Sequence, residues 1–236
     1  MGRAFEYRRA AKEKRWDKMS KVFPKLAKAI TFAAKDGGPD PELNPRLRMA
    51  ILNAKAQNMP KDNIEAAIKR AAGKDAATIS QVSYEAKAPH GVMLFIECAT
   101  DNTNRTVVNL RTYINKSGGQ MLDNGALEFM FTRKAVVEFK VPEGADNDEI
   151  ELELIDHGLE EIEFEEGLAT AYGAYTDFSK LSHGVEELGY ELVKANLQRL
   201  PNAPTSLDET QMAEIETILD KIEDDEDVQA VFTNIE

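Results

Sequence analysis

The chain has 236 residues and a net charge of −13, from 29 basic and 42 acidic side chains. This length allows two or three small domains, each with a core of its own. The single cysteine, Cys98, excludes an internal disulfide and is typical of a reducing compartment. No apolar run is long enough for a membrane span, and no secretory segment is recognisable, so we expect a cytoplasmic protein that does not bind membranes.

The charge is distributed unevenly along the chain. Residues 1–75 carry 18 basic and 9 acidic side chains, a net charge of +9. Residues 76–236 carry 11 basic and 33 acidic side chains, a net charge of −22. This separation favours a polyanion-binding end attached to an acidic body, and we interpret it as contact with nucleic acid. The alternative is a basic surface that serves only solubility.

The first 28 residues combine many cations with aromatic side chains. Cations neutralise phosphates, and Phe5 and Trp16 could stack on unpaired bases. Residues 3–19 are expected to form either a helix or a mobile arm. The candidate nucleic-acid contacts here are Arg3, Arg8, Arg9, Lys12, Lys14, Arg15, Trp16, Lys18, Lys21, Lys25 and Lys28.

Three helices are predicted in the next fifty residues. The first covers 22–35, with Pro24 in its first turn, where a missing N–H is tolerated. The second begins at the N-cap Asn44 and the third covers 60–72. Nothing marks one of them as a recognition helix for the major groove. The further candidate nucleic-acid contacts are Arg46, Arg48, Lys55, Lys61, Lys69 and Arg70.

From Ser80 onward, β-branched and aromatic residues predict strands. A first set of elements is expected to contain strands at 82–88, 92–99 and 127–131 and a helix at 103–116. Near the C-terminus, a helix at 208–222 and a strand at 228–233 are expected. Between them, residues 134–196 follow the order strand, helix, strand, strand, helix, strand, which is a ferredoxin-like unit.

The first set lacks a helix and a strand that the C-terminal segment can supply. We therefore predict an α+β protein of three domains, in which one ferredoxin-like domain is inserted in the other. The expected domains are an all-helical basic domain (1–79), a discontinuous middle domain (80–133 plus 201–236) and an inserted acidic domain (134–200).

No constellation of residues indicates catalysis. His90, His157 and His183 lack the spacing of a metal site, and Cys98 lies in an apolar strand. The acidic run at 223–227 is expected to be solvated. The sequence therefore predicts no enzyme activity, no cofactor, no metal and no small-molecule substrate.

One polar loop stands out. Asp101 and Thr103 suit the start of a helix, but Arg105 places a cation in its first turn, against the helix dipole. Two interpretations remain open. Arg105 pairs with a nearby carboxylate, or Asn102, Asn104 and Arg105 form a loop that binds a ligand such as phosphate, or a partner protein.

Four segments resemble the YebC-type family of transcriptional regulatory proteins. They are NPRLRMAILNAKAQNMPKDNIEAAIKRAAG (44–73), YEAKAPHGVMLFIECATDNTNRTVVNLR (84–111), GGQMLDNGALEFMF (118–131) and, more loosely, DKIEDDEDVQAVFTNIE (220–236). The resemblance implies a three-domain fold and a non-enzymatic role in gene expression. It implies DNA binding for some members and a ribosome-linked role in translation for others, including a mitochondrial translational activator of cytochrome c oxidase.

The sequence matches a family signature at the loop 101–106 and departs from the family at two places. His90-Gly91 stands where many members have Gly-Gly. The chain begins Gly2-Arg3-Ala4-Phe5, where many members have a stretch like Gly-His-Ser-Lys-Trp. The second departure lies inside the expected binding end.

Residues and resemblance together predict a nucleic-acid-binding regulator of gene expression, a transcriptional regulator that binds DNA through its basic N-terminal domain, with ribosomal RNA as the alternative partner. The alternatives are a ribosome-associated translation factor and an acidic protein-interaction scaffold without a nucleic-acid ligand. Residues 133–201 carry 6 basic and 17 acidic side chains, a net charge of −11. That domain is a poor RNA platform and is better suited to docking on the ribosome, on another basic protein or on a second copy.

Overall fold

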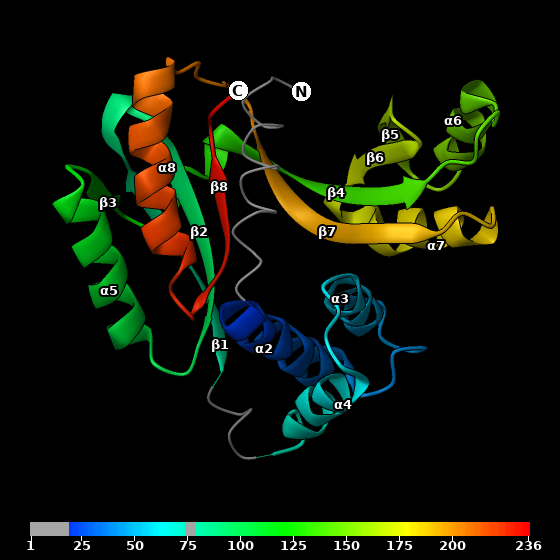
Figure 1. Ribbon diagram of the computed structural model, residues 1–236, viewed down its shortest axis with the longest axis horizontal. Coiled ribbons are helices and arrows are strands. Elements are labelled where there is room, and N and C mark those ends of the chain that lie inside the picture. Colours follow the sequence, from blue (N-terminus) through cyan, green and yellow to red (C-terminus); the bar gives the residue numbers. More distant parts are fainter. Residues whose placement is uncertain (1–18, 74–78) are drawn as a thin grey trace.

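The computed structural model describes residues 19–73 and 79–236. In these ranges the chain forms a helical unit and two four-stranded antiparallel sheets (Figure 1). We call the sheets, with the helices that cover them, the first and second α+β units. The α+β class, the helical N-terminal region and the two sheets were all predicted from the sequence and are confirmed.

The helical unit consists of α2 (Met19–Gly37), α3 (Pro45–Ala56) and α4 (Lys61–Arg70). Its core holds Ile30 from α2, Leu47 from α3 and Ile64 from α4. Asn44 is the predicted N-cap of α3, since its side chain accepts from the Leu47 N–H at 3.0 Å. The prediction that Pro24 lies in the first turn was wrong. Helix α2 is already helical from Met19, so Pro24 lies inside it and costs one intrahelical hydrogen bond.

The first α+β unit combines a segment that follows the helical unit with the C-terminal segment of the chain. Its elements are β1 (Ser80–Lys87), β2 (Met93–Thr100), α5 (Thr103–Lys116), β3 (Gln120–Leu122), α8 (Glu209–Glu223) and β8 (Val228–Thr233). The strand order is β3-β1-β2-β8. Side chains such as Ile96, Leu110 and Ile215 pack between the sheet and the two helices, so α5 and α8 cover the same face.

The second α+β unit is continuous in sequence. Its elements are β4 (Phe131–Lys140), α6 (Asn147–Ile155), β5 (Leu159–Glu165), β6 (Leu168–Ala174), α7 (Phe178–Glu187) and β7 (Leu192–Pro201). The strand order β5-β6-β4-β7 is that of the predicted ferredoxin-like unit, with both outer strands antiparallel to their neighbours. In the chain this unit lies between β3 and α8 of the first unit.

The strand expected at 127–131 was wrong. Residues Glu128–Met130 form a short 3-10 turn, and the strand begins only at Phe131. The buried carboxylate of Glu85 holds the preceding loop, because it accepts from the N–H groups of Gly125 at 2.8 Å and Leu127 at 2.5 Å. These N–H groups are therefore committed to a side chain and cannot join a sheet.

We propose that the boundary between the two α+β units falls inside β4, near residue 133. Phe131 packs edge-on against Phe95 of the first sheet, with ring centroids 6.1 Å apart. Ala135, four residues later, belongs to the core of the second unit. The corresponding boundary on the return strand lies near the end of β7, and the helical unit ends before β1.

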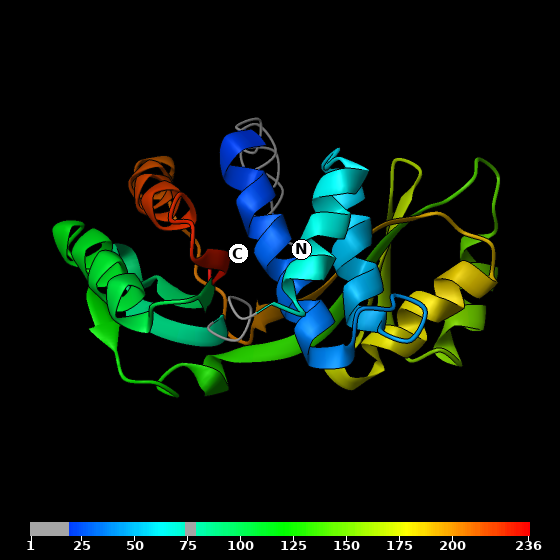
Figure 2. The ribbon, with the colours of Figure 1, turned by 90° about the horizontal axis from the view of Figure 1, so that it is seen from below.

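The helical unit is joined to the second α+β unit at the edge of β7. The Asn53 side chain on α3 accepts from the Ala195 N–H at 3.3 Å and donates to the Ala195 carbonyl at 3.0 Å. Met49 and Leu52 of α3 pack into the core of the same unit. Figure 2 shows α2, α3 and α4 standing between the helices of the first unit and those of the second.

A separate contact joins the two α+β units. The Arg199 guanidinium on β7 lies 3.7 Å from the centre of the Phe95 ring, and its Nε donates to Glu97 at 3.1 Å. Phe95 and Glu97 both point to the face of the first sheet that α5 and α8 do not cover, since the alternate residues Leu94 and Ile96 pack under those helices. Strand β7 therefore contacts both of the other units.

Replacing Asn53 by Ala is expected to destabilise the protein by about 1–2 kcal/mol, because the N–H and carbonyl of Ala195 lose their partner at a covered sheet edge. Urea unfolding measures the loss, and amide hydrogen exchange should show faster exchange at Ala195. Asn63→Ala, at an exposed position of α4, gains the same helix propensity and is the matched control. Equal stability of the two variants would contradict this role of Asn53.

Candidate functional site

The structure covers part of the predicted nucleic-acid surface. The candidates Arg3, Arg8, Arg9, Lys12, Lys14, Arg15, Trp16 and Lys18 lie outside the described residues, as does the side chain of Lys21. The candidates that can be placed are on α2, α3 and α4, and they divide into an exposed group and a group that contacts other parts of the protein.

The exposed group lies on α3 and α4. Its members are Arg46, Lys55, Lys61, Lys69 and Arg70. Two of them have acidic neighbours: Arg46 donates to Asp36 at 2.8 Å, and the Lys61 ammonium lies 3.7 Å from a Glu65 oxygen. Arg48 is half-buried, and its Nε makes no hydrogen bond. Such exposed pairs are weak, so these cations stay available to a polyanion.

Lys25 and Lys28 contact the segment Glu223–Asp227, which we call the acidic turn. The Lys25 ammonium donates to the Glu223 carbonyl. The Lys28 ammonium donates to the Glu226 carbonyl at 3.0 Å and to Asp227 Oδ1 at 2.8 Å. Glu223 is the last residue of α8, where carbonyls lack an intrahelical partner and favour a cation. The sequence assigned these lysines to a phosphate backbone; here they hold α2 against the first α+β unit.

Asp227 is the centre of this contact, and only 1% of its surface is exposed. Besides Lys28, it accepts from Arg105 Nη2 at 2.8 Å and from Thr106 Oγ1 at 2.9 Å. Burial alone would raise the pKa of Asp227, but the hydrogen bonds from Lys28, Arg105 and Thr106 outweigh it and lower the pKa to about 2. The carboxylate is therefore charged at neutral pH although it is buried.

Arg105 answers the question left open by the sequence. It pairs with carboxylates on both sides, Asp227 and, at 2.9 Å, Asp101. These two acids offset the unfavourable position of a cation in the first turn of α5. The N-cap of α5 is Asn102, whose side chain accepts from the Arg105 N–H at 3.1 Å. Asn104 is exposed on the same turn. The predicted ligand loop is thus built around an ion pair within the chain.

The expectation that the acidic run is solvated holds for Asp224 and Glu226, which are exposed, but was wrong for Asp225 and Asp227. Asp225 is only 8% exposed and accepts from Asn109 Nδ2 at 3.0 Å and from the Tyr113 hydroxyl at 3.2 Å. Burial, together with the nearby charge of Asp225, raises the pKa of Tyr113. The run packs against α5 because two of its carboxylates find donors there. The one signal in the sequence was Arg105, a cation in the first turn of a helix.

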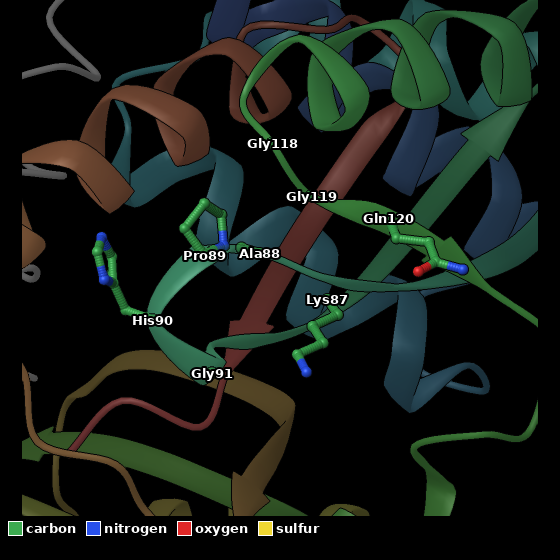
Figure 3. Close-up of a pocket in the computed structure, with 8 residues that line it drawn as sticks. All are labelled: Lys87, Ala88, Pro89, His90, Gly91, Gly118, Gly119 and Gln120. Carbon is green, nitrogen blue, oxygen red and sulfur yellow. The ribbon is translucent and has the colours of Figure 1, made fainter.

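The side chains that line the cleft beside His90 do not converge on a common point, as the groups of a catalytic or ligand-binding site would. It measures about 430 Å³ and is lined by Lys87, Ala88, Pro89, His90, Gly91, Gly118, Gly119 and Gln120. Figure 3 shows the His90 ring turned away from Lys87 and Gln120. Its Nε2 lies 2.7 Å from a Glu214 oxygen instead. The backbone of His90 is left-handed, with φ of 61°, a conformation that glycine adopts more readily than histidine.

Cys98 is a buried thiol. It is 1% exposed in β2, and burial raises its pKa to about 12, so it is not a nucleophile at neutral pH. Within residues 19–73 and 79–236, no group of three His, Cys, Asp or Glu side chains is placed to hold a metal ion. In the same ranges, no helix has the length and apolar character that crossing a membrane requires.

A basic helical unit, joined to the first α+β unit by the Lys28–Asp227 ion pair and to the second by Asn53 and Met49, defines a class of three-unit α+β proteins. The family model described as "TACO1/YebC protein N-terminal domain" matches residues 3–74. The family model described as "TACO1/YebC second and third domain" matches residues 79–235. The chain belongs to the TACO1/YebC family.

Curated relatives are similar over their full length. A protein of Wolinella succinogenes is 65% identical and one of Campylobacter concisus is 63% identical, each over 236 residues and 100% of both chains. Both are named probable transcriptional regulatory proteins. The crystal structure of a conserved hypothetical protein from Aquifex aeolicus is similar with a TM-score of 0.81 at 34% identity, covering 92% of this chain and 90% of that one.

Acid should weaken the fold through Asp227. Its folded pKa of about 2 lies below its ordinary value of 3.8. Its contribution, on the order of 2 kcal/mol, is therefore complete above about pH 4 and is lost as the pH falls toward 2. Unfolding measured across this range should show wild type converging on Asp227→Asn, which lacks the titrating group. A stability difference between the two that stays constant with pH would contradict this assignment.

Proposed function

We propose that the protein is a nucleic-acid-binding regulator of gene expression that grips the phosphate backbone through its basic helical unit. The observation that carries the proposal is the exposed group of cations on α3 and α4, attached to a body with a net charge of −22 in residues 76–236. Phosphates are attracted to the first and repelled by the second, so the molecule approaches a polyanion with one end forward.

The helical unit supports binding to the backbone more than reading of bases. On α4, Lys61, Glu65 and Lys69 are spaced four residues apart and share an exposed face. A carboxylate in the middle of that face disfavours its insertion into a groove lined by phosphates. Contacts from lysine ammonium groups fix position on a duplex without carrying sequence information. We therefore expect weak preference among DNA sequences from this unit.

DNA is the proposed ligand because the curated relatives are named probable transcriptional regulatory proteins. Ribosomal RNA is the alternative ligand, since it presents the same phosphate to the same cations. In that case the protein would be a translation factor, and the acidic second unit would dock on basic ribosomal proteins. A scaffold without any nucleic-acid ligand is the remaining alternative. The proposal assigns the protein no catalytic step, cofactor or membrane, and places it in the cytoplasm.

Neutralising four of the five cations of the exposed group should weaken binding to a random-sequence DNA duplex and flatten its salt dependence. The test variant carries glutamine at Lys55, Lys61, Lys69 and Arg70. Each lost phosphate contact is expected to reduce the slope of log affinity against log salt by about 0.9. Fluorescence anisotropy at several salt concentrations measures both quantities.

A matched control removes as much positive charge from the two α+β units. It carries glutamine at the exposed residues Arg111, Lys116, Lys180 and Lys221. This control should keep the wild-type slope. If both variants lose the same affinity, net charge alone explains binding, and the helical unit is not the interface. A third variant with Arg8, Arg9, Lys12 and Arg15 reversed in charge measures the share of the N-terminal stretch.

Crosslinking in cells, followed by sequencing of DNA and RNA partners, separates the two ligands. A transcriptional regulator should enrich DNA. A translation factor should enrich ribosomal RNA and sediment with ribosomes in a nuclease-sensitive manner. The control for crosslinking combines the glutamine substitutions on α3 and α4 with the charge reversals at Arg8, Arg9, Lys12 and Arg15. If wild type recovers neither polymer above this control, the scaffold is the surviving interpretation.

A further inference from the structure

The acidic turn offers Lys25 and Lys28 the same chemistry as a nucleic-acid backbone. The two ammonium groups meet the carbonyl oxygens of Glu223 and Glu226 and the carboxylate of Asp227. A run of oxygen acceptors with one full negative charge resembles successive phosphate oxygens. The lysines that continue the basic N-terminal stretch are therefore occupied by the protein's own acidic segment.

The buried carboxylate stays neutralised if Lys28 leaves. Arg105 provides Nε and Nη2 contacts to Asp227 and Thr106 adds a hydroxyl, and both come from α5 in the same α+β unit. Departure of Lys28 therefore does not create an unpaired buried charge, which is the usual penalty for breaking such a pair. Solvent can reach Lys28, since 24% of its side chain is exposed, whereas only 2% of the Asp227 side chain is exposed.

The described contacts of the helical unit with the second α+β unit are made by uncharged side chains, whereas on the side of the first unit Lys35 of α2 also donates to the Ile79 carbonyl at 3.3 Å. Asn53 binds the backbone of Ala195, and Met49 packs in the core of the second unit. A polyanion does not compete for such contacts. The helical unit can therefore separate from the first α+β unit while it remains attached to the second, with the Arg199 contact to Phe95 and Glu97 near the pivot.

We propose that the contact of Lys25 and Lys28 with the acidic turn is an autoinhibitory latch, which a phosphate backbone opens by replacing the acidic turn as the partner of both lysines. This inference rests on the proposed function and adds a regulation to it. In the closed state, the exposed cations of α3 and α4 make the first contact. In the open state, Lys25 and Lys28 join them, and the helical unit moves away from the first α+β unit.

The test measures the distance between α4 and α8 in the full chain by pulsed electron paramagnetic resonance. Spin labels are attached at Ala66→Cys and Ala213→Cys, two exposed positions away from the latch. Native Cys98 is kept, because it is buried and its raised pKa leaves it unreactive. Distances are recorded with and without a saturating random-sequence DNA duplex at about 0.1 M salt, where the Debye length is about 10 Å.

Two charge variants provide the comparison. Lys25→Gln combined with Lys28→Gln removes the latch and should lengthen the distance without DNA. Lys116→Gln combined with Lys180→Gln removes equal charge from exposed positions of α5 and α7, outside the proposed DNA-binding surface, and should leave the distance at its wild-type value. In wild type, DNA should shift the distance toward that of the latch variant, by more than the width of the labels' own distribution.

The outcomes separate this inference from the proposed function. DNA binding, confirmed by anisotropy on the same labelled sample, with an unchanged distance would overturn the latch and leave the proposed function standing. Absence of binding would overturn both. A latch variant whose distance equals that of the control variant would also overturn the latch. A DNA-induced shift that the control variant retains would support it.

Discussion

A buried carboxylate that must remain charged organises this protein. Asp227 is covered by α2 and α5, and three donors from two different units compensate it: Lys28, Arg105 and Thr106. A buried ion of this kind is tolerated only when it is paired and hydrogen-bonded. The requirement brings the N-terminal helix and the polar loop at the start of α5 together with the acidic turn, which lies about half of the chain or more away from both.

The polar contacts between the units differ in kind. Asn53 covers the edge of β7 with neutral hydrogen bonds, Arg199 stacks on Phe95, and two lysines meet the acidic turn. Salt and polyanions act on the last of these far more than on the first. The lysine joint holds the helical unit against the first α+β unit, so a charged ligand that competes for these lysines can change the domain arrangement, which is the physical basis of the latch.

Much of the fold could be predicted from the sequence, because it is written in local patterns. The N-cap at Asn44 and the alternation of strands and helices after Phe131 both follow from short-range signals. The prediction for Pro24 failed because a helix can continue through one proline when the neighbouring residues pack well. The prediction of a strand at 127–131 failed because the preceding loop is held by hydrogen bonds to Glu85, which join residues 40 and 42 positions apart.

The site was harder to predict for the same reason. Charge counts identified a basic end and an acidic body, but they could not show that Lys25 and Lys28 meet the acidic turn nearly two hundred residues later. Arg105, a cation in an unfavourable helical position, pointed to a missing partner, and the structure identifies it as Asp227. Ion pairs of this range depend on the packing of domains, which no local pattern encodes.

The most direct measurement of this account is the titration of the Asp227 carboxyl by carbon-13 NMR, assigned with the Asp227→Asn variant. If Lys28, Arg105 and Thr106 compensate a buried charge, the carboxyl should titrate near pH 2, well below 3.8. A midpoint at or above 3.8 would show that burial outweighs the donors, and the joint described here would not hold the units together.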